Sequence, residues 1–144
     1  MERIREIVGK EYSNTLGIVA YKDGVKVINE YFNGSFESES VHTFSIVKSI
    51  VGVLVGIAID KGFLEDVHQK VLPFFPEYVL KRNQEQLREV TIENFLTMTV
   101  PYKFKSDPWT KVCTSQDWGM KVLEQIGGKE QIGERVHYST LGVQ

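Results

Sequence analysis

The segment that most limits what this chain can fold into is TFSIVKSIVGVLVGIAID, residues 43–60. Its uninterrupted apolar run, Ile50 to Ile59, is ten residues long and lies between Lys48 and Asp60. Because a helix needs about 20 apolar residues to cross a bilayer, this run is too short to span one. The segment therefore predicts a helix buried in the core of a soluble protein, and we expect Gly62 to end it.

Two glycines of this helix, Gly52 and Gly56, lie four residues apart. The same spacing occurs where membrane helices pair through small residues. On so short a helix, we expect the glycines to let a neighbouring element of the fold approach closely.

Composition narrows the class of protein. The 144 residues are 42% hydrophobic and 25% charged, which is ordinary for a globular domain. A net charge of −2 supports neither a nucleic-acid-binding protein nor a polybasic membrane anchor. Cys113 is the single cysteine, so no disulfide can form within the chain. The first residues, MERIREIVGK, contain no apolar signal-peptide region, so we expect a cytoplasmic protein if Met1 is the natural start.

The pattern along the chain predicts one hairpin followed mostly by helices, an α+β order. Residues 15–22 and 25–32 are strand-like, and Asp23-Gly24 between them is a favoured two-residue hairpin turn. Both strands carry apolar residues on both faces, so we expect them to belong to a larger sheet. The other expected elements are helices at 2–13, 90–98 and 115–126 with Thr91 as an N-cap, a capped helical turn over 64–78 cut off by Pro73 and Pro76, and mostly loop over 99–114.

Ser45 and Lys48 place a hydroxyl and an amine at the start of the apolar helix. Side chains three residues apart share a helix face, so the amine can reach the hydroxyl. A lysine kept neutral by apolar surroundings can take the serine proton, and free backbone N–H groups at a helix start can stabilise the oxyanion of acyl transfer. In the alternative interpretation, Ser45 only caps the helix and Lys48 extends to solvent. These residues alone leave both interpretations open.

Three segments, in order along the chain, resemble the serine β-lactamase and penicillin-binding-protein superfamily. They are TFSIVKSIVGVLVGIAIDKGFLEDVHQKVLPFFPEY, VTIENFLTMT and GERVHYSTLGVQ. The branch they resemble most holds class C β-lactamases, family VIII carboxylesterases and nylon-oligomer hydrolases. The first resembles the active-site helix with its Ser-x-x-Lys motif, and the last resembles the Tyr-x-Asn motif. The resemblance implies a β-lactamase/transpeptidase-like α+β fold.

The same resemblance implies roles for four residues. Ser45 would be the acylated nucleophile, Lys48 its hydrogen-bonded base, and Tyr138 the group that shuttles the proton between serine and leaving group. Thr140 stands where the family has asparagine and would contact substrate, although a hydroxyl lacks the reach of an amide. The alternative for Tyr138 is an ordinary core or surface aromatic. The resemblance implies no cofactor and no metal, and His42 and His137 show no spacing typical of a zinc site or a triad.

One motif of the superfamily is absent from the sequence. No Lys-Thr-Gly or His-x-Gly follows Tyr138, and no segment downstream of the hairpin supplies the remaining strands of the sheet. We therefore expect residues 1–144 to be the N-terminal part of a single β-lactamase-like domain, an apparently truncated fragment without activity of its own. We also expect the exposed edge of the hairpin to pair with a second copy and form a homodimer.

Two functions follow from these observations. The first is a serine hydrolase that acts through an acyl-enzyme on a small-molecule ester, amide or β-lactam. The second is a non-catalytic β-lactamase-like scaffold that acts in binding or assembly. The pair Ser45 and Lys48, with Tyr138, favours the first, whereas Thr140 and the missing third motif favour the second.

Overall fold

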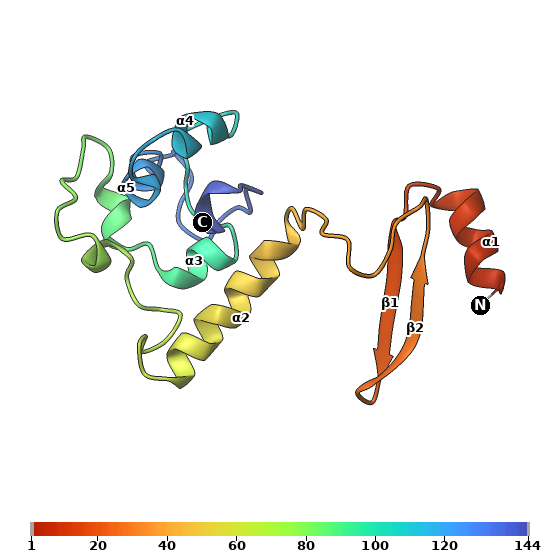
Figure 1. The fold of residues 1–144 in the computed structure, drawn as a ribbon. Coiled ribbons are helices and arrows are strands. Elements are labelled where there is room, and N and C mark those ends of the chain that lie inside the picture. The colour runs from red at the N-terminus through yellow and green to blue at the C-terminus, as the bar shows by residue number, and fades with distance from the viewer. Residues whose placement is uncertain (1, 144) are drawn as a thin grey trace. The chain divides into compact units, whose positions relative to one another are not determined.

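A computed structural model describes residues 2–143, and it shows an α+β protein with a two-stranded antiparallel hairpin and five α-helices in those residues (Figure 1). The α-helices and strands are α1 (Glu2–Glu11), β1 (Gly17–Lys22), β2 (Val25–Tyr31), α2 (Ile46–Asp60), α3 (Ile92–Leu96), α4 (Trp109–Cys113) and α5 (Trp118–Leu123). Three 3₁₀ helices complete the order: η1 (Leu72–Phe74), η2 (Glu85–Arg88) and η3 (Leu141–Val143). The chain divides into two compact units, Met1–His42 and Thr43–Gln144.

The first unit is built around the predicted hairpin. Asp23 and Gly24 both have left-handed backbones, with φ of 50° and 78°, as a two-residue turn of this type requires. The register pairs Gly17 with Tyr31 and Lys22 with Val25, with an irregularity at Ala20/Tyr21. Within the described residues the sheet has only these two strands, so the larger sheet that was expected is not formed. The homodimer through the hairpin edge stays a prediction.

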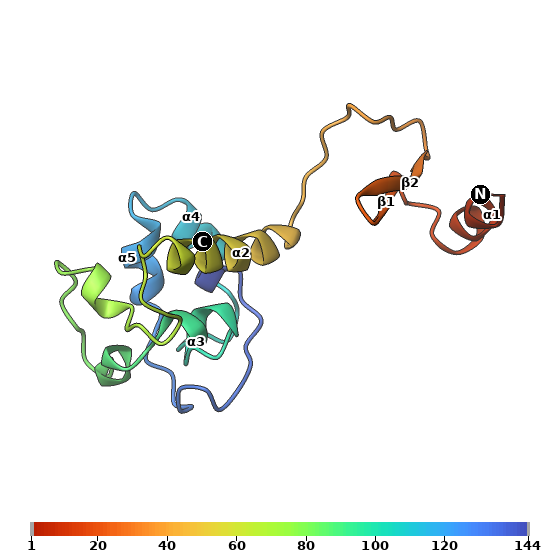
Figure 2. The same cartoon turned by 90° about the horizontal axis from the view of Figure 1, so that it is seen from below.

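The apolar helix forms as predicted and is α2 of the second unit (Figures 1 and 2). Its end is set by Gly62, whose φ of +74° a β-carbon would strain. The Phe63 N–H donates to the Ala58 carbonyl at 2.8 Å, and the Gly62 N–H donates to the Ile59 carbonyl at 2.9 Å. These two bonds satisfy carbonyls that the last helical turn leaves free.

The predicted burial of α2 is wrong. None of its residues is buried within the described structure, and its only partly covered face carries Lys48, Val51, Val55 and Ile59. The opposite face exposes apolar side chains, namely Ile46, Val47, Ile50, Val53, Leu54 and Ile57. The predicted close approach at the helix glycines is also wrong, because a β-carbon at either Gly52 or Gly56 would meet nothing within 4 Å. Among residues 2–143, the structure has no helix with both the length and the apolarity to cross a membrane.

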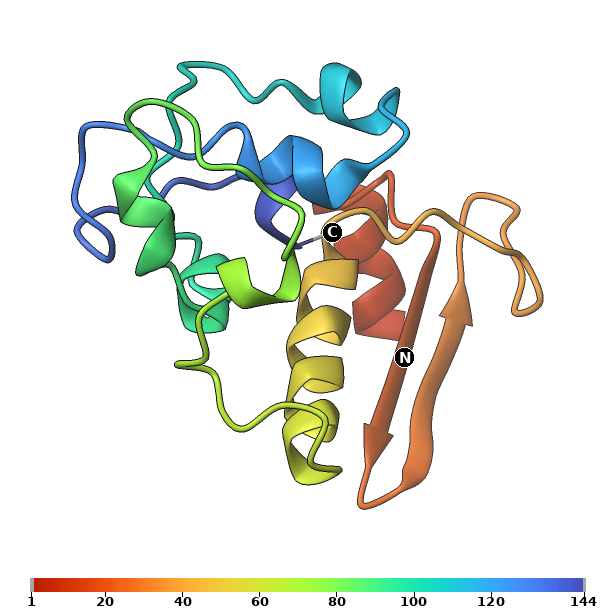
Figure 3. The ribbon, with the colours of Figure 1, turned by 90° about the vertical axis from the view of Figure 1, so that its left-hand side faces the viewer.

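The core of the second unit comes from its loops and short helices, which make up most of its trace in Figure 3. The side chains that are buried there include Leu87, Val90, Val100, Val112, Leu123, Ile126 and Leu141. Apolar residues spread over many short segments thus build the core, while the longest apolar run stays at its surface. The apolarity of a segment therefore did not predict, by itself, which part of the chain is buried.

Several predicted boundaries change in this unit. Thr91 caps α3 as predicted, because its hydroxyl accepts from the Asn94 N–H and the Asn94 side chain accepts from the Thr91 N–H. The capped helical turn predicted within 64–78 is wrong: the segment has only η1, with Pro73 in its first turn. The helix α4 lies within the predicted loop 99–114, and α5 is shorter than the helix predicted over 115–126.

Candidate active site at the start of α2

Ser45 and Lys48 meet at the start of α2. The Lys48 Nζ donates to Ser45 Oγ at 3.1 Å, the contact that their spacing of three residues predicts. Ser45 occupies the N-cap position, but its side chain makes no capping hydrogen bond. The alternative in which Ser45 only caps the helix and Lys48 extends to solvent is therefore wrong.

Tyr138 joins this pair from the other end of the unit. Its phenolic oxygen donates to Ser45 Oγ at 2.6 Å, and Lys48 Nζ lies 5.3 Å from the centre of its ring. The irregular segment that carries Tyr138 is held on its N-terminal side by the His137 N–H, which donates to the Met98 carbonyl at 2.8 Å. The hydroxyl, amine and phenol that the sequence singled out thus lie within one hydrogen-bonded cluster.

The neighbours of Tyr138 in this cluster lower the pKa of its phenol. The hydrogen bond with Ser45 is the main cause that lowers the pKa of Tyr138, because the serine hydroxyl can also donate to a phenolate. Loss of water around the phenol raises that pKa, and the charge of Lys48 lowers it again. This direction of the shift makes Tyr138 a candidate for the group that accepts the serine proton.

Two expectations for the surroundings of Ser45 are not met. Lys48 is only half-buried and Ser45 is exposed, so the apolar enclosure expected around the amine is absent from the described structure. The first N–H groups of the helix are also in use, because those of Ile46, Val47 and Lys48 donate to the carbonyls three residues earlier. These N–H groups are not free to bind an oxyanion in the way the sequence predicted.

Thr140 is bonded to Asp107 through its backbone. Its N–H donates to Asp107 Oδ2 at 3.1 Å, and the Ser139 hydroxyl donates to the same oxygen at 2.9 Å. Thr140 thus lies two residues from the phenol of Tyr138, and its role in contacting substrate stays a prediction. Sequence reasoning missed Asp107, since an Asp-Pro pair in a loop is a turn signal rather than a site signal.

Two of the histidines lie beside glutamate carboxylates. His137 Nε2 lies 3.7 Å from Glu130 Oε1, and His68 Nδ1 lies 3.3 Å from Glu93 Oε2. In the part of the chain that the structure describes, no group of three or more His, Cys, Asp or Glu side chains could hold a metal ion.

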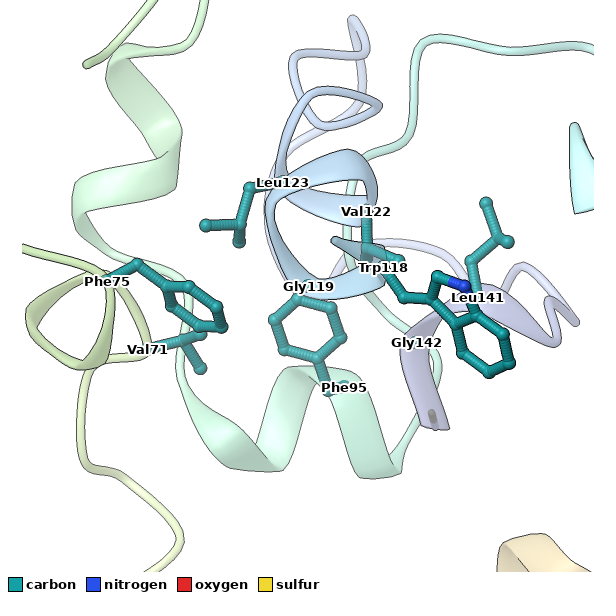
Figure 4. Close-up of a pocket in the computed structure, with 9 residues that line it drawn as sticks. All are labelled: Val71, Phe75, Phe95, Trp118, Gly119, Val122, Leu123, Leu141 and Gly142. Carbon is teal, nitrogen blue, oxygen red and sulfur yellow. The ribbon is translucent and has the colours of Figure 1, made fainter. Parts of the chain in front are cut away.

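An apolar cavity of about 290 Å³ lies elsewhere in the second unit (Figure 4). It is lined by Val71, Phe75, Phe95, Trp118, Gly119, Val122, Leu123, Leu141 and Gly142. This lining has no hydroxyl, thiol or titratable side chain, so the cavity offers shape and apolar contact but no nucleophile or base. Leu141 and Gly142 follow Tyr138 by three and four residues, so one segment supplies both the phenol and part of the cavity wall.

Comparison of the chain with models of protein families gives no match, and comparison with curated proteins gives none either. The resemblance to the serine β-lactamase superfamily therefore stays a prediction. The geometry around Ser45 is the observation from which a function can be proposed.

Proposed function

We propose that this protein is a serine hydrolase of the β-lactamase-like type, which forms an acyl-enzyme with an ester, amide or β-lactam. The observation that carries the proposal is the cluster in which Ser45 Oγ accepts from Lys48 at 3.1 Å and from Tyr138 at 2.6 Å. A serine hydroxyl needs a neighbouring base to become a nucleophile, and the cluster offers two candidates.

The proposed catalytic steps use the side chains of Ser45, Lys48 and Tyr138. Tyr138, as phenolate, takes the proton of Ser45 while Oγ bonds to the carbonyl carbon of the substrate. Lys48, as ammonium, keeps the phenolate and the developing oxyanion in a positive field. When the tetrahedral intermediate collapses, the bond to the leaving group breaks and the Tyr138 phenol returns the proton to that group. In deacylation, the Tyr138 phenolate takes a proton from water while the water oxygen bonds to the acyl carbon, and the phenol returns that proton to Ser45 Oγ as the acyl bond to Oγ breaks.

A fluorophosphonate probe tests the first half of this cycle. The Ser45 oxygen would displace fluoride from phosphorus, leaving a stable adduct that mass spectrometry of a protease digest assigns to one residue. We expect an adduct on Ser45 that disappears in Ser45→Ala and persists in Ser49→Ala, a matched change of an exposed serine on the same helix. Turnover of an ester is expected to be weak, because the N–H groups at the start of α2 already donate to carbonyls three residues earlier and are not free to bind an oxyanion.

The second candidate function is a non-catalytic β-lactamase-like scaffold for binding or assembly. The engaged N–H groups of Ile46, Val47 and Lys48 favour it, since an acyl-transfer enzyme needs free donors for its oxyanion. The probe separates the two functions. A folded protein that gains no adduct on Ser45 even with prolonged exposure contradicts the hydrolase and supports the scaffold.

A further inference from the structure

One carboxylate holds the segment that follows Tyr138. Asp107, in the loop before α4, accepts the Ser139 hydroxyl at 2.9 Å and the Thr140 N–H at 3.1 Å, both on Oδ2. The Ser139 hydroxyl oxygen in turn accepts from the Leu141 N–H at 3.1 Å. Ser139 is only 2% exposed, so this chain of bonds is shielded from water. Two consecutive residues, Ser139 and Thr140, are thereby bonded to a loop some thirty positions earlier in the sequence.

The side chain of Tyr138 needs such support. Tyr138 is 67% exposed, so little packing holds its side chain in place. Its backbone has one anchor before it, the bond from the His137 N–H to the Met98 carbonyl, and one after it, the Asp107 carboxylate. Loss of either anchor would let the phenol move away from Ser45.

We propose that Asp107 is a positioning residue, which holds Tyr138 against Ser45 through its bonds to Ser139 and Thr140. This inference rests on the proposed function for its consequence in catalysis, but the placement of Tyr138 can be measured without catalysis. Asp107 does not touch the reacting atoms in this assignment and acts only through the segment that carries the phenol.

The environment of Asp107 decides which substitution is the conservative one. Its second oxygen, Oδ1, is buried, and the described residues give it no hydrogen-bond partner. The buried Tyr102 hydroxyl likewise has no partner among the described residues. Burial raises the pKa of Tyr102, and the charge of Asp107 raises it further, so the two groups are close enough to interact. An asparagine could keep the bonds made on Oδ2 and turn its amide toward the Tyr102 hydroxyl, so it is the conservative variant of this position.

The substitutions that test this inference are Asp107→Ala and Asp107→Asn. Alanine removes both bonds to Ser139 and Thr140. Asparagine keeps one oxygen in the place of Oδ2, where both bonds are made, and its amide can donate toward Tyr102. The matched control is Asp117→Ala, which removes another carboxylate bonded to a backbone N–H, that of Met120 at 2.9 Å, without touching the Tyr138 segment.

The first readout is the ionisation of Tyr138, followed as phenolate absorbance and corrected by subtraction of the Tyr138→Phe titration. We expect Asp107→Ala to move the midpoint up, toward the value of a free phenol, because the phenol loses its contact with Ser45 and Lys48. Asp107→Asn and Asp117→Ala should leave the midpoint close to that of the unaltered protein. Circular dichroism establishes that each variant is folded. If Asp107→Ala is unfolded, Ser139→Ala takes its place as the test variant. It removes the bond from the Ser139 hydroxyl to Asp107 and leaves only the bond from the Thr140 N–H.

The second readout is the rate of fluorophosphonate labelling. We expect about a 100-fold loss in Asp107→Ala, the scale of effect that a displaced catalytic group produces, and nearly full rescue in Asp107→Asn. A Tyr138 midpoint that is the same in folded Asp107→Ala and in the unaltered protein overturns the positioning role. If the midpoint moves but the unaltered protein forms no adduct on Ser45, the positioning role stands and the hydrolase proposal fails.

Discussion

Tyr138 donates to Ser45 Oγ across 2.6 Å, although the two residues are 93 positions apart in the sequence. One end of the contact is the start of the longest helix, and the other lies in an irregular segment near the end of the second unit. Lys48 bonds to the same serine oxygen from the helix. Ser45 Oγ therefore accepts from two donors. One of these donors must lose a proton before it can take the proton of the Ser45 hydroxyl. In the proposed mechanism this donor is the phenol of Tyr138, whose pKa its neighbours lower.

Replacing Tyr138 with phenylalanine should slow the labelling of Ser45 by a fluorophosphonate. Phenylalanine keeps the ring beside Lys48 but removes the proton acceptor, and loss of a general base typically costs about 100-fold or more. The measurement is the second-order rate of adduct formation. Tyr12→Phe, an exposed tyrosine of the first unit, is the control and should leave the rate unchanged. A Tyr138→Phe rate equal to the control rate would mean that Lys48 alone activates the serine.

The rate of labelling should also rise with pH through the ionisation of Tyr138. Because the pKa of this phenol is lowered from 10.0, the phenolate forms, and the rate rises, at a lower pH than for a free phenol. Lys48→Ala removes a positive charge that lowers this pKa, so the rise should move to higher pH. Lys48→Arg keeps the charge and should retain most of the shift. A profile that is identical in Lys48→Ala and Lys48→Arg would show that the charge of Lys48 does not act on Tyr138.

The parts of the fold that depend on neighbouring residues could be predicted from the sequence. The Asp23-Gly24 turn, the Thr91 cap and the helix end at Gly62 all follow from local backbone chemistry, and all three are present. The contact between Ser45 and Lys48 is also local, since helix geometry alone brings these side chains together.

The parts that depend on packing could not be predicted in the same way. An apolar helix surface predicts that something should cover it, but not which segment does so, and α2 is left uncovered by the described residues. Tyr138 could be chosen only through a resemblance, because no local pattern links it to Ser45. Asp107 was missed because its contacts with Ser139 and Thr140 depend on how a loop folds, which a single sequence does not specify.

The glycines of α2 give a prediction about stability. A β-carbon at Gly52 or Gly56 meets nothing within 4 Å, so alanine at either position should stabilise the second unit by about 1 kcal/mol through helix propensity. Gly62 is equally uncrowded but has a φ of +74°, so Gly62→Ala should destabilise by about 1 kcal/mol. Urea unfolding measures all three free energies. Destabilisation by Gly52→Ala or Gly56→Ala would show instead that another element packs closely on this helix face.

Gln84 should be the most sensitive polar position of the core. It is 1% exposed; its Oε1 accepts from the Tyr78 hydroxyl and the Lys81 N–H, and its Nε2 donates to the carbonyls of Leu123 and Ile126. Gln84→Met keeps the volume but leaves three of these four groups without a partner, since the Leu123 carbonyl still accepts from the Ile126 N–H, and we expect a loss of about 3 kcal/mol. Tyr78→Phe removes one of the four bonds and should cost about 1 kcal/mol. A smaller loss in Gln84→Met than in Tyr78→Phe would contradict this central role for Gln84.

Protonation of Glu124 should make the protein less stable in acid. The Lys121 and Lys81 ammonium groups donate to its two oxygens at 2.6 and 2.7 Å, and these bonds lower its pKa from 4.5 to about 2. Because the folded pKa lies below the unfolded one, the stabilisation is complete above about pH 4.5 and is lost as the pH falls toward about 2. Ion pairs at a protein surface contribute at most about 1 kcal/mol each, which sets the size of the expected loss.

Glu124→Gln should therefore lower the free energy of unfolding near neutral pH and flatten its decline over that acid range. Unfolding by urea at a series of pH values measures both changes. The control is Glu77→Gln, which alters an exposed carboxylate that has no ion pair among the described residues, and it should keep the slope of the unaltered protein. If Glu124→Gln and Glu77→Gln decline in parallel with the unaltered protein, the two lysines do not stabilise the fold through Glu124. The acid sensitivity would then come from other carboxylates.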